Sequence, residues 1–165
     1  MEIRKLDAGD ASQYRVLRIE ALTNDPDAFG ASLEDALKAP LEKTENRLSA
    51  DTSITFGAFE EGELVGNVTL AWETGSKSRH RASVYAVYVT PSARGKGVAR
   101  ILMETLIEFA EQHDEIEQLY LMVTSTNLPA VKLYGHLGFL KYGVDLRSMK
   151  TEGRYIDEDL MVKFL

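Results

Sequence analysis

Arg94-Gly95-Lys96-Gly97 is the segment whose residue types and spacing most clearly indicate a binding site. Its two glycines let the backbone turn tightly and approach a ligand closely. The apolar residues after this glycine loop, from Val98 to Phe109, recur at helical spacing and predict a helix. Because the first N–H groups of a helix have no partner within it, they bind anions readily. The segment therefore predicts an anion site, with an ordinary strand-to-helix turn as the alternative.

Two widespread phosphate-binding motifs do not describe this loop. The P-loop pattern is excluded because the sequence contains neither Gly-Lys-Ser nor Gly-Lys-Thr. The dinucleotide fingerprint requires a third glycine at the position that Arg100 occupies. The loop alone does not identify its ligand, and a nucleotide-binding protein of another type stays open as an interpretation.

The elements around the glycine loop place it at the end of a strand. Val84 to Val89 is β-branched and aromatic without charge, which predicts a buried strand. Pro91 ends this strand because it has no N–H to donate. Leu119 to Val123 is a second apolar stretch that follows the predicted helix. A strand–helix–strand connection makes these two strands parallel neighbours.

The remaining sequence supplies further strands and helices without a repeat, a low-complexity tract or a linker. Residues 1–165 are therefore predicted to form a single domain. Segment 27–40 is ambiguous, with a helical pattern from about Ser32. The other predicted strands are 2–6, 53–59, 64–72, 139–146 and 154–165, and the other predicted helices are 11–24, 41–48 and 129–137.

Two motifs in this sequence resemble those of the GCN5-related N-acetyltransferase (GNAT) family. Arg94-Gly95-Lys96-Gly97-Val98-Ala99 resembles the family's Arg/Gln-x-x-Gly-x-Gly/Ala loop, which binds acetyl-CoA. Asn127-x-x-Ala130-x-x-Leu133-Tyr134-x-x-x-Gly138-Phe139 resembles the second half of the family's domain. Both motifs stand in the family's order beside the expected strand and helix, and the resemblance covers residues 55–141.

The resemblance implies an α/β fold with a mixed central sheet of about six to seven strands and helices on both faces. It also implies that the parallel strand pair splays apart at the end where Pro91 follows the first strand. In the family, the backbone groups left unpaired there receive the pantetheine arm of acetyl-CoA. Such a slot is physically sensible, because buried backbone groups without any partner are costly.

The same resemblance assigns residues to acetyl-CoA binding. The backbone around Val87 would contact the acetyl carbonyl, whose oxygen gains negative charge when an amine attacks. The backbone at Val89 would contact the pantetheine amides. Asn127 would bond the pantetheine arm, cap its own helix, or do both. The pyrophosphate would lie on the N–H groups of Gly95, Lys96, Gly97, Val98 and Ala99, with Arg94 supplementing this cradle.

Tyr134 is predicted to be the catalytic acid, because the family places a tyrosine here to protonate the departing CoA thiolate. A phenol with a pKa of about 10 can donate a proton to a thiolate whose thiol has a pKa of about 8.5. The alternative is a helix tyrosine that packs against the sheet.

The general base is not identified by the sequence. Glu73, at the end of a predicted strand, and Glu20, on the first predicted helix, are the main candidates, with His80 and Tyr85 as weaker ones. Family members often carry a glutamate on the strand before the loop, where this sequence has Ser83, Tyr85 and Tyr88. This departure favours proton removal through a water molecule.

Composition narrows the classes of function. The net charge of −7 argues against general nucleic-acid binding and suits a cationic amine partner. Without cysteine there is no disulfide and no thiol nucleophile, and the three histidines are too scattered to predict a metal site. No apolar run approaches membrane-spanning length, so we expect a cytoplasmic protein without a membrane partner.

These observations predict an acetyl-CoA-dependent N-acetyltransferase acting on a primary amine, either a small molecule or a peptide. Transfer would occur by direct attack in a ternary complex, because no activated Ser or Cys arrangement is visible. The alternative is a non-catalytic acyl-CoA-binding sensor on the same fold. The identity of the amine stays open, and pairing of two copies through the closing strands is a further expectation.

Overall fold

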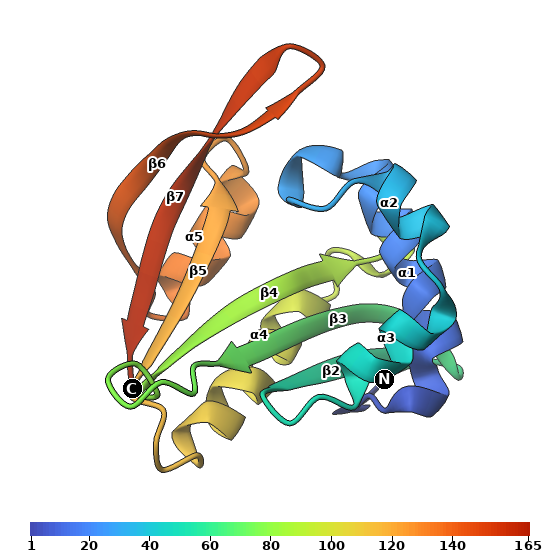
Figure 1. The fold of residues 1–165 in the computed structure, drawn as a ribbon, viewed down its shortest axis with the longest axis horizontal. Helices are drawn as coiled ribbons and strands as arrows, with labels where there is room; N and C mark the ends of the chain where they lie inside the picture. Colours follow the sequence, from blue (N-terminus) through green and yellow to red (C-terminus); the bar gives the residue numbers. More distant parts are fainter.

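A seven-stranded sheet runs through the molecule, with its strands in the order β1-β2-β3-β4-β5-β7-β6 (Figure 1). The computed structural model describes all residues from 1 to 165. Only β4 and β5 are parallel, and every other neighbouring pair is antiparallel. The strands are β1 (Glu2–Lys5), β2 (Ser53–Glu60), β3 (Glu63–Trp72), β4 (Arg81–Val89), β5 (Gln118–Thr124), β6 (Leu140–Thr151) and β7 (Arg154–Phe164).

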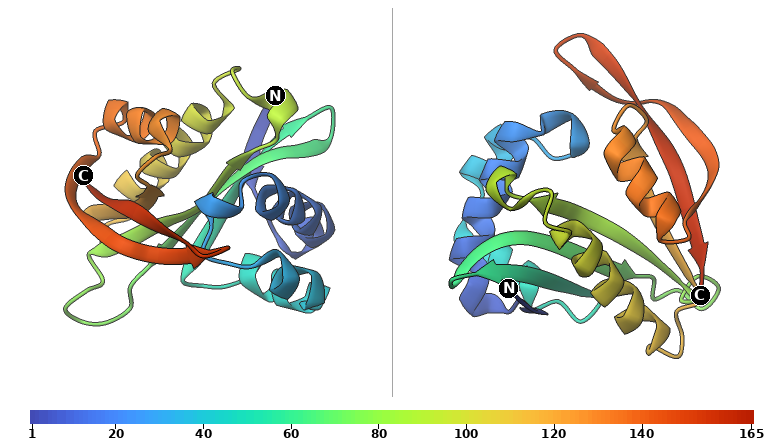
Figure 2. Two further views of the ribbon diagram at one scale, coloured as in Figure 1. Left: turned by 90° about the horizontal axis from the view of Figure 1, so that it is seen from above. Right: turned by 180° about the vertical axis from the view of Figure 1, so that it is seen from behind.

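Helices cover both faces of this sheet, so the predicted fold class is confirmed (Figure 2). Leu102 and Leu106 of α4 belong to the larger apolar core, whereas Tyr14 and Leu17 of α1 belong to a second core on the other face. None of the helices combines the length and the apolar composition needed to cross a membrane. The helices are α1 (Ala11–Asn24), α2 (Leu33–Lys38), α3 (Leu41–Leu48), α4 (Val98–Glu111) and α5 (Leu128–His136).

The parallel strands β4 and β5 pair only near their beginnings. The register joins Arg81–Ser83 with Gln118–Tyr120, and the two strands then diverge (Figure 1). We call the diverging segments, 84–89 and 121–124, the fork. On their outer sides β4 pairs with β3 and β5 pairs with β7. The edges without a strand partner therefore face each other across the fork.

A bulge bends β4 within the fork. The register between β3 and β4 shifts between Asn67 and Thr69, and Ala86 has a φ of 53°. A residue with a side chain is strained in this left-handed region. Asn67 is 4% exposed, and its Nδ2 donates a hydrogen bond of 2.6 Å to the Ala86 carbonyl. This buried amide stabilises the bulge and, with it, the path of β4 along the fork.

The start of β4 differs from the sequence-based expectation. The strand begins at Arg81 instead of Val84, because Arg81 and Ser83 pair with β5 through their backbones while both line a cavity. Because these side chains are polar, a prediction based on apolar runs does not include this part of the strand. The guanidinium of Arg81 lies 4.3 Å from the ring centroid of Tyr120, on the opposing strand.

Two further elements also differ from expectation. β6 continues to Thr151 instead of ending near Leu146, and it accommodates a register shift against β7 on the way. The ambiguous segment contains the short helix α2, whose N-terminus is capped by the side chain of Ser32. A helix of six residues has little periodicity to detect, which explains the ambiguity.

We expect Asn67→Ala to lower the free energy of unfolding by about 1–3 kcal/mol, because it leaves the Ala86 carbonyl without its buried donor. Urea denaturation monitored by circular dichroism measures this change. Asn46→Ala is the matched control, because Asn46 is exposed on α3 and makes no hydrogen bond through its side chain. Equal stability of the two variants would contradict the role given to Asn67.

Candidate active site

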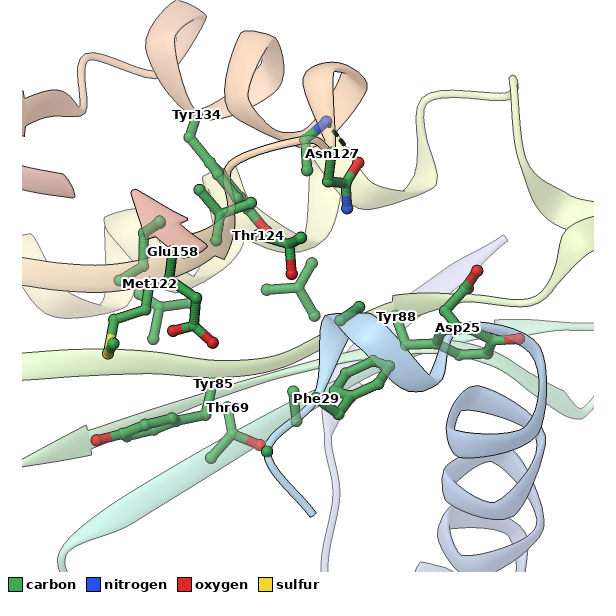
Figure 3. Close-up of a pocket in the computed structure, with 18 of the residues that line it drawn as sticks. Asp25, Phe29, Thr69, Tyr85, Tyr88, Met122, Thr124, Asn127, Tyr134 and Glu158 are labelled. Atoms are coloured by element: carbon green, nitrogen blue, oxygen red, sulfur yellow. Dashed lines mark hydrogen bonds between the residues drawn. The ribbon is translucent and has the colours of Figure 1, made fainter. Parts of the chain in front are cut away.

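A cavity occupies the fork and extends over the face of the sheet that carries α1 (Figure 3). Most of its lining comes from β3, β4, β5 and β7, from α1 and α5, and from the segment 24–31, and single residues of β2, β6, α3 and α4 also contribute. These elements are distant in the sequence. Their side chains line one cavity because β4 and β5 diverge and leave space between them. The cavity therefore offers both side chains and backbone groups to a ligand.

The glycine loop presents free backbone donors beside the fork. Gly95 and Gly97 have φ values of 76° and 80°, a conformation that glycine adopts without strain. None of the N–H groups from Gly95 to Arg100 donates a hydrogen bond within the protein. A run of unsatisfied donors at the N-terminus of a 14-residue helix suits a phosphate group. The loop thus fits the pyrophosphate that the family resemblance implied for it.

Arg94 and Lys96 are already engaged with other residues. The Nε of Arg94 donates to the Val89 carbonyl at 2.9 Å, and its Nη2 lies 2.6 Å from the Asp25 carboxylate. Lys96 forms an exposed ion pair with Glu60 at 3.2 Å. Arg94 therefore fixes the loop to β4 and to the residue that follows α1, while the backbone amides are the groups left free.

The backbone of Val89 faces the fork. Because Thr90 donates its N–H to the Val65 carbonyl on β3, the N–H of Val89 points to the opposite side of its strand. Val89 and Val87 both line the cavity. The backbone at these two positions thus lies along the cavity in which the pantetheine arm is predicted.

Tyr134 reaches from α5 into the cavity (Figure 3). The residue is 6% exposed, and its ring packs edge-on against Phe139 at a centroid distance of 6.1 Å. Its hydroxyl has no hydrogen-bond partner in the protein, so nothing offsets the loss of water. Burial therefore raises the pKa of Tyr134 to about 12, and the phenol keeps its proton at neutral pH.

Asn127 is the N-cap of α5. Its Oδ1 accepts a hydrogen bond of 3.4 Å from the N–H of Ala130, and Figure 3 shows the amide at the edge of the cavity. The Nδ2 group has no partner in the protein. The helix-cap interpretation thus holds, and the donor side of the same amide stays free for a ligand.

The segment between α1 and α2 is fixed to both sides of the fork. On the β4 side, Asp25 forms its ion pair with Arg94. On the β5 side, Thr124 Oγ1 donates to the Asp27 carbonyl at 2.7 Å, and Arg154 lies 3.3 Å from the Asp27 carboxylate. These contacts bring the segment against the cavity, where Phe29 meets the Tyr88 ring.

The two glutamates predicted as candidate bases lie outside the cavity lining. Glu20 accepts hydrogen bonds from Tyr88 Oη at 2.8 Å and from Thr90 Oγ1 at 2.6 Å. Glu73 is exposed beyond the end of β3, where its N–H donates to the Arg81 carbonyl beside the paired ends of β4 and β5. Neither glutamate is hydrogen-bonded to Tyr134, and of the three predicted catalytic residues only Tyr134 lines the cavity.

Glu158 is a carboxylate of the cavity that was not predicted from the sequence. It lies half-buried on β7 opposite Thr124 of β5, and Figure 3 shows it projecting into the cavity. Burial raises the pKa of Glu158, and the charge of Asp145 acts in the same direction, against a hydrogen bond from Ser148. No local motif marks this residue, because only the placement of β7 beside β5 brings it to the fork.

Comparison with known proteins assigns this fold and site to a family. The profile of the Acetyltransferase (GNAT) family matches residues 18–139, and the chain therefore belongs to that family. This confirms the predicted family. The roles of individual residues stay predictions.

The relatives of this chain are named for different compounds. Streptothricin acetyltransferase of Escherichia coli is 36% identical over 116 residues, which cover 68% of this chain and 62% of the relative. Mycothiol acetyltransferase of Brachybacterium faecium is 30% identical over 146 residues, covering 87% of this chain and 41% of the relative. This chain thus spans less than two thirds of the length of either relative. A solved GNAT-family acetyltransferase from Streptococcus pneumoniae superposes with a TM-score of 0.89 at 28% identity, over 99% of each chain.

We expect Gly97→Ala to raise the dissociation constant for acetyl-CoA about tenfold or more, because strain at this φ shifts the converging amides. Isothermal titration calorimetry measures the binding. Gly62→Ala is the matched control: Gly62 has a φ of 86° in the turn between β2 and β3, and neither glycine has an atom near its added Cβ. We expect both variants to lose similar stability. An equal loss of acetyl-CoA binding in both would therefore contradict the prediction that the amides of the glycine loop bind the pyrophosphate.

Proposed function

We propose that this chain transfers an acetyl group from acetyl-CoA to a primary amine by direct attack in a ternary complex. One observation carries the proposal: the fork has free helix N-terminal amides beside it and the unpartnered hydroxyl of Tyr134 within its cavity. A binding site for a sensor needs the first feature but makes no use of a buried proton donor. The predicted single domain, residues 1–165, carries all of these groups.

The residues around the fork fit acetyl-CoA. The amides of Gly95 to Ala99 would hold the pyrophosphate, and Val89 and the Asn127 amide would bond the pantetheine arm. The backbone at Val87 would meet the acetyl carbonyl. When bound, acetyl-CoA supplies an activated acetyl thioester, whose C–S bond breaks as the amine nitrogen bonds the acetyl carbon.

Tyr134 is proposed as the acid that protonates the departing sulfur. A pKa of about 12 makes the free phenol a weak donor. The same dry surroundings also disfavour a thiolate, however, and raise the pKa of its thiol. Proton transfer from the Tyr134 hydroxyl to the sulfur moves the negative charge from the sulfur to the phenolate oxygen, and a proton from solvent then restores the phenol.

Glu158 is proposed as the group that takes the proton from the attacking amine, directly or through water. Its carboxylate lines the cavity, whereas those of Glu20 and Glu73 do not. A raised pKa makes a carboxylate a stronger base, which suits this role at neutral pH. The water relay predicted from the sequence is compatible with Glu158 as the final acceptor.

Two expectations from the sequence stay proposals beside this function. Pairing of two copies through β6 and β7 is supported by the large apolar side chains exposed on β6, among them Leu140, Tyr142 and Leu146. A cytoplasmic location rests on composition alone. The acceptor is proposed to be an amine, as a small molecule or at the end of a peptide.

We expect Tyr134→Phe to lower kcat about a hundredfold or more, with little change in the KM for acetyl-CoA, because the ring's packing is kept and only the proton donor is lost. Release of free thiol from acetyl-CoA across a panel of amines measures the rate. Tyr155→Phe is the control, since Tyr155 is exposed on β7 and outside the cavity. Unchanged turnover in Tyr134→Phe would contradict the proposed acid.

We expect the kcat of the wild-type protein to fall as the pH decreases through the raised pKa of Glu158, because protonation removes the base. Since this pKa lies above the ordinary 4.5, the loss begins at a higher pH than for a free glutamate. Glu158→Gln should abolish this pH dependence and lower the plateau of kcat about a hundredfold. Profiles of kcat at saturating amine measure the effect.

Glu20→Gln and Glu73→Gln are the comparison variants for this profile. In Glu20→Gln, the amide oxygen of the new side chain can still accept the hydrogen bonds from Tyr88 and Thr90. The role of Glu158 is overturned if one of these two variants loses the fall of kcat at low pH while Glu158→Gln keeps it. The glutamate changed in that variant is then the base.

A further inference from the structure

We propose that the cavity contains an anion subsite on its α1 side, formed by Arg18, Tyr14 and Arg47, and that the amine acceptor also carries a carboxylate. The inference rests on the proposed acetyl transfer and narrows its acceptor to amino acids and related compounds. All three residues line the same cavity as Tyr134 and Glu158.

Arg18 is a half-buried cation without a counterion. It forms no ion pair and no hydrogen bond with the protein, and its guanidinium lies 5.1 Å from the ring centroid of Phe29. Burial lowers the pKa of Arg18; the interaction with Tyr14 opposes this shift, and the charge of Arg47 adds to it. A charge kept away from water is costly unless an opposite charge meets it. The missing partner is therefore an anion brought by a ligand.

Tyr14 supplies an independent sign of a missing partner. The residue is 3% exposed, and its hydroxyl is one of the few buried side-chain polar atoms in this structure without a hydrogen bond. Tyr14 and Arg18 are one helical turn apart on α1, so their side chains share a face. Buried polar groups in native proteins normally have a partner. A carboxylate could accept hydrogen bonds from both side chains.

The other carboxylates beside the cavity are unable to serve Arg18. Asp25 is paired with Arg94, and Asp27 is paired with Arg154. Glu20, on the same helix, accepts from Tyr88 and Thr90. Glu158 forms no ion pair and lies on β7, across the fork from α1 (Figure 1). The cavity thus places a free cation on its α1 side and a free carboxylate on its β7 side, which matches an acceptor with both charges.

The test compares acceptors that differ only in their carboxylate. Thiol release from acetyl-CoA is measured with α- and ω-amino acids of increasing length and with the amide of each. We expect kcat/KM to favour the amino acid of the fitting length over its amide about ten- to a hundredfold. Arg18→Gln should remove this preference, because it lowers kcat/KM for the amino acid and leaves kcat/KM for its amide unchanged. Arg79→Gln, which changes an exposed arginine outside the cavity, should keep the preference.

A second variant separates the subsite from a purely structural role. Tyr14→Phe removes an unsatisfied buried hydroxyl, so we expect a thermal midpoint at or above that of the wild type. It should nevertheless raise the KM for the carboxylate-bearing acceptor severalfold without raising that for its amide. A stable Tyr14→Phe protein with both KM values unchanged, or equal loss of both substrates in Arg18→Gln, would overturn the inference.

Absence of the proposed transferase activity can be distinguished from absence of the anion subsite. If the activity is absent, no acceptor releases thiol from acetyl-CoA, and calorimetry then measures the binding of the amino acids themselves. Binding that is lost in Arg18→Gln supports the anion subsite without the reaction. No binding of any amino acid by the wild-type protein overturns the subsite. A preference for amides over acids in the rate assay overturns the subsite and leaves the proposed function standing.

Discussion

The divergence of β4 and β5 after three residue pairs is the feature that makes the site possible. In a continuous parallel sheet, the N–H and C=O groups of these strands would bond each other. Here the bulge at Ala86, held by Asn67, gives β4 a different path, and Val89 turns its backbone toward the fork. The sheet stays stable because each strand keeps its outer neighbour, β3 or β7. The inner edges are then available to a ligand with amides of its own.

Charged residues around the fork divide into two groups by whether they have partners. Asp25 and Asp27 fix the segment between α1 and α2 to opposite sides of the fork. Exposed pairs of this kind contribute little stability, so their main effect is to position the segment and Phe29. Arg18 and Glu158 instead form no ion pair within the protein, and burial shifts the pKa of each. This contrast separates the residues that shape the cavity from those that are proposed to act in it.

Local sequence patterns were sufficient for the glycine loop, the strand before it and the helix after it. Two glycines and a proline restrict the backbone locally, and the helical spacing of apolar residues persists over fourteen residues. The spacing of Asn127 and Tyr134 likewise follows from one short helix. The family and the fold class could therefore be predicted from the sequence. The start of β4 could not, because Arg81 and Ser83 are polar residues that face a cavity.

The order of residues was enough to predict most of the elements. It also placed the free amides of the glycine loop and the hydroxyl of Tyr134 on their helices, because both depend on neighbours in the chain. Which charges meet at the fork depended instead on how the elements pack. The sheet brought Glu158 beside β5 by inserting β7 between β5 and β6. Packing instead bonded Glu20, which does not line the cavity, to Tyr88 and Thr90. Whether a carboxylate is a base or an anchor depends on its burial and partners. Those are fixed by contacts between segments that are distant in the sequence.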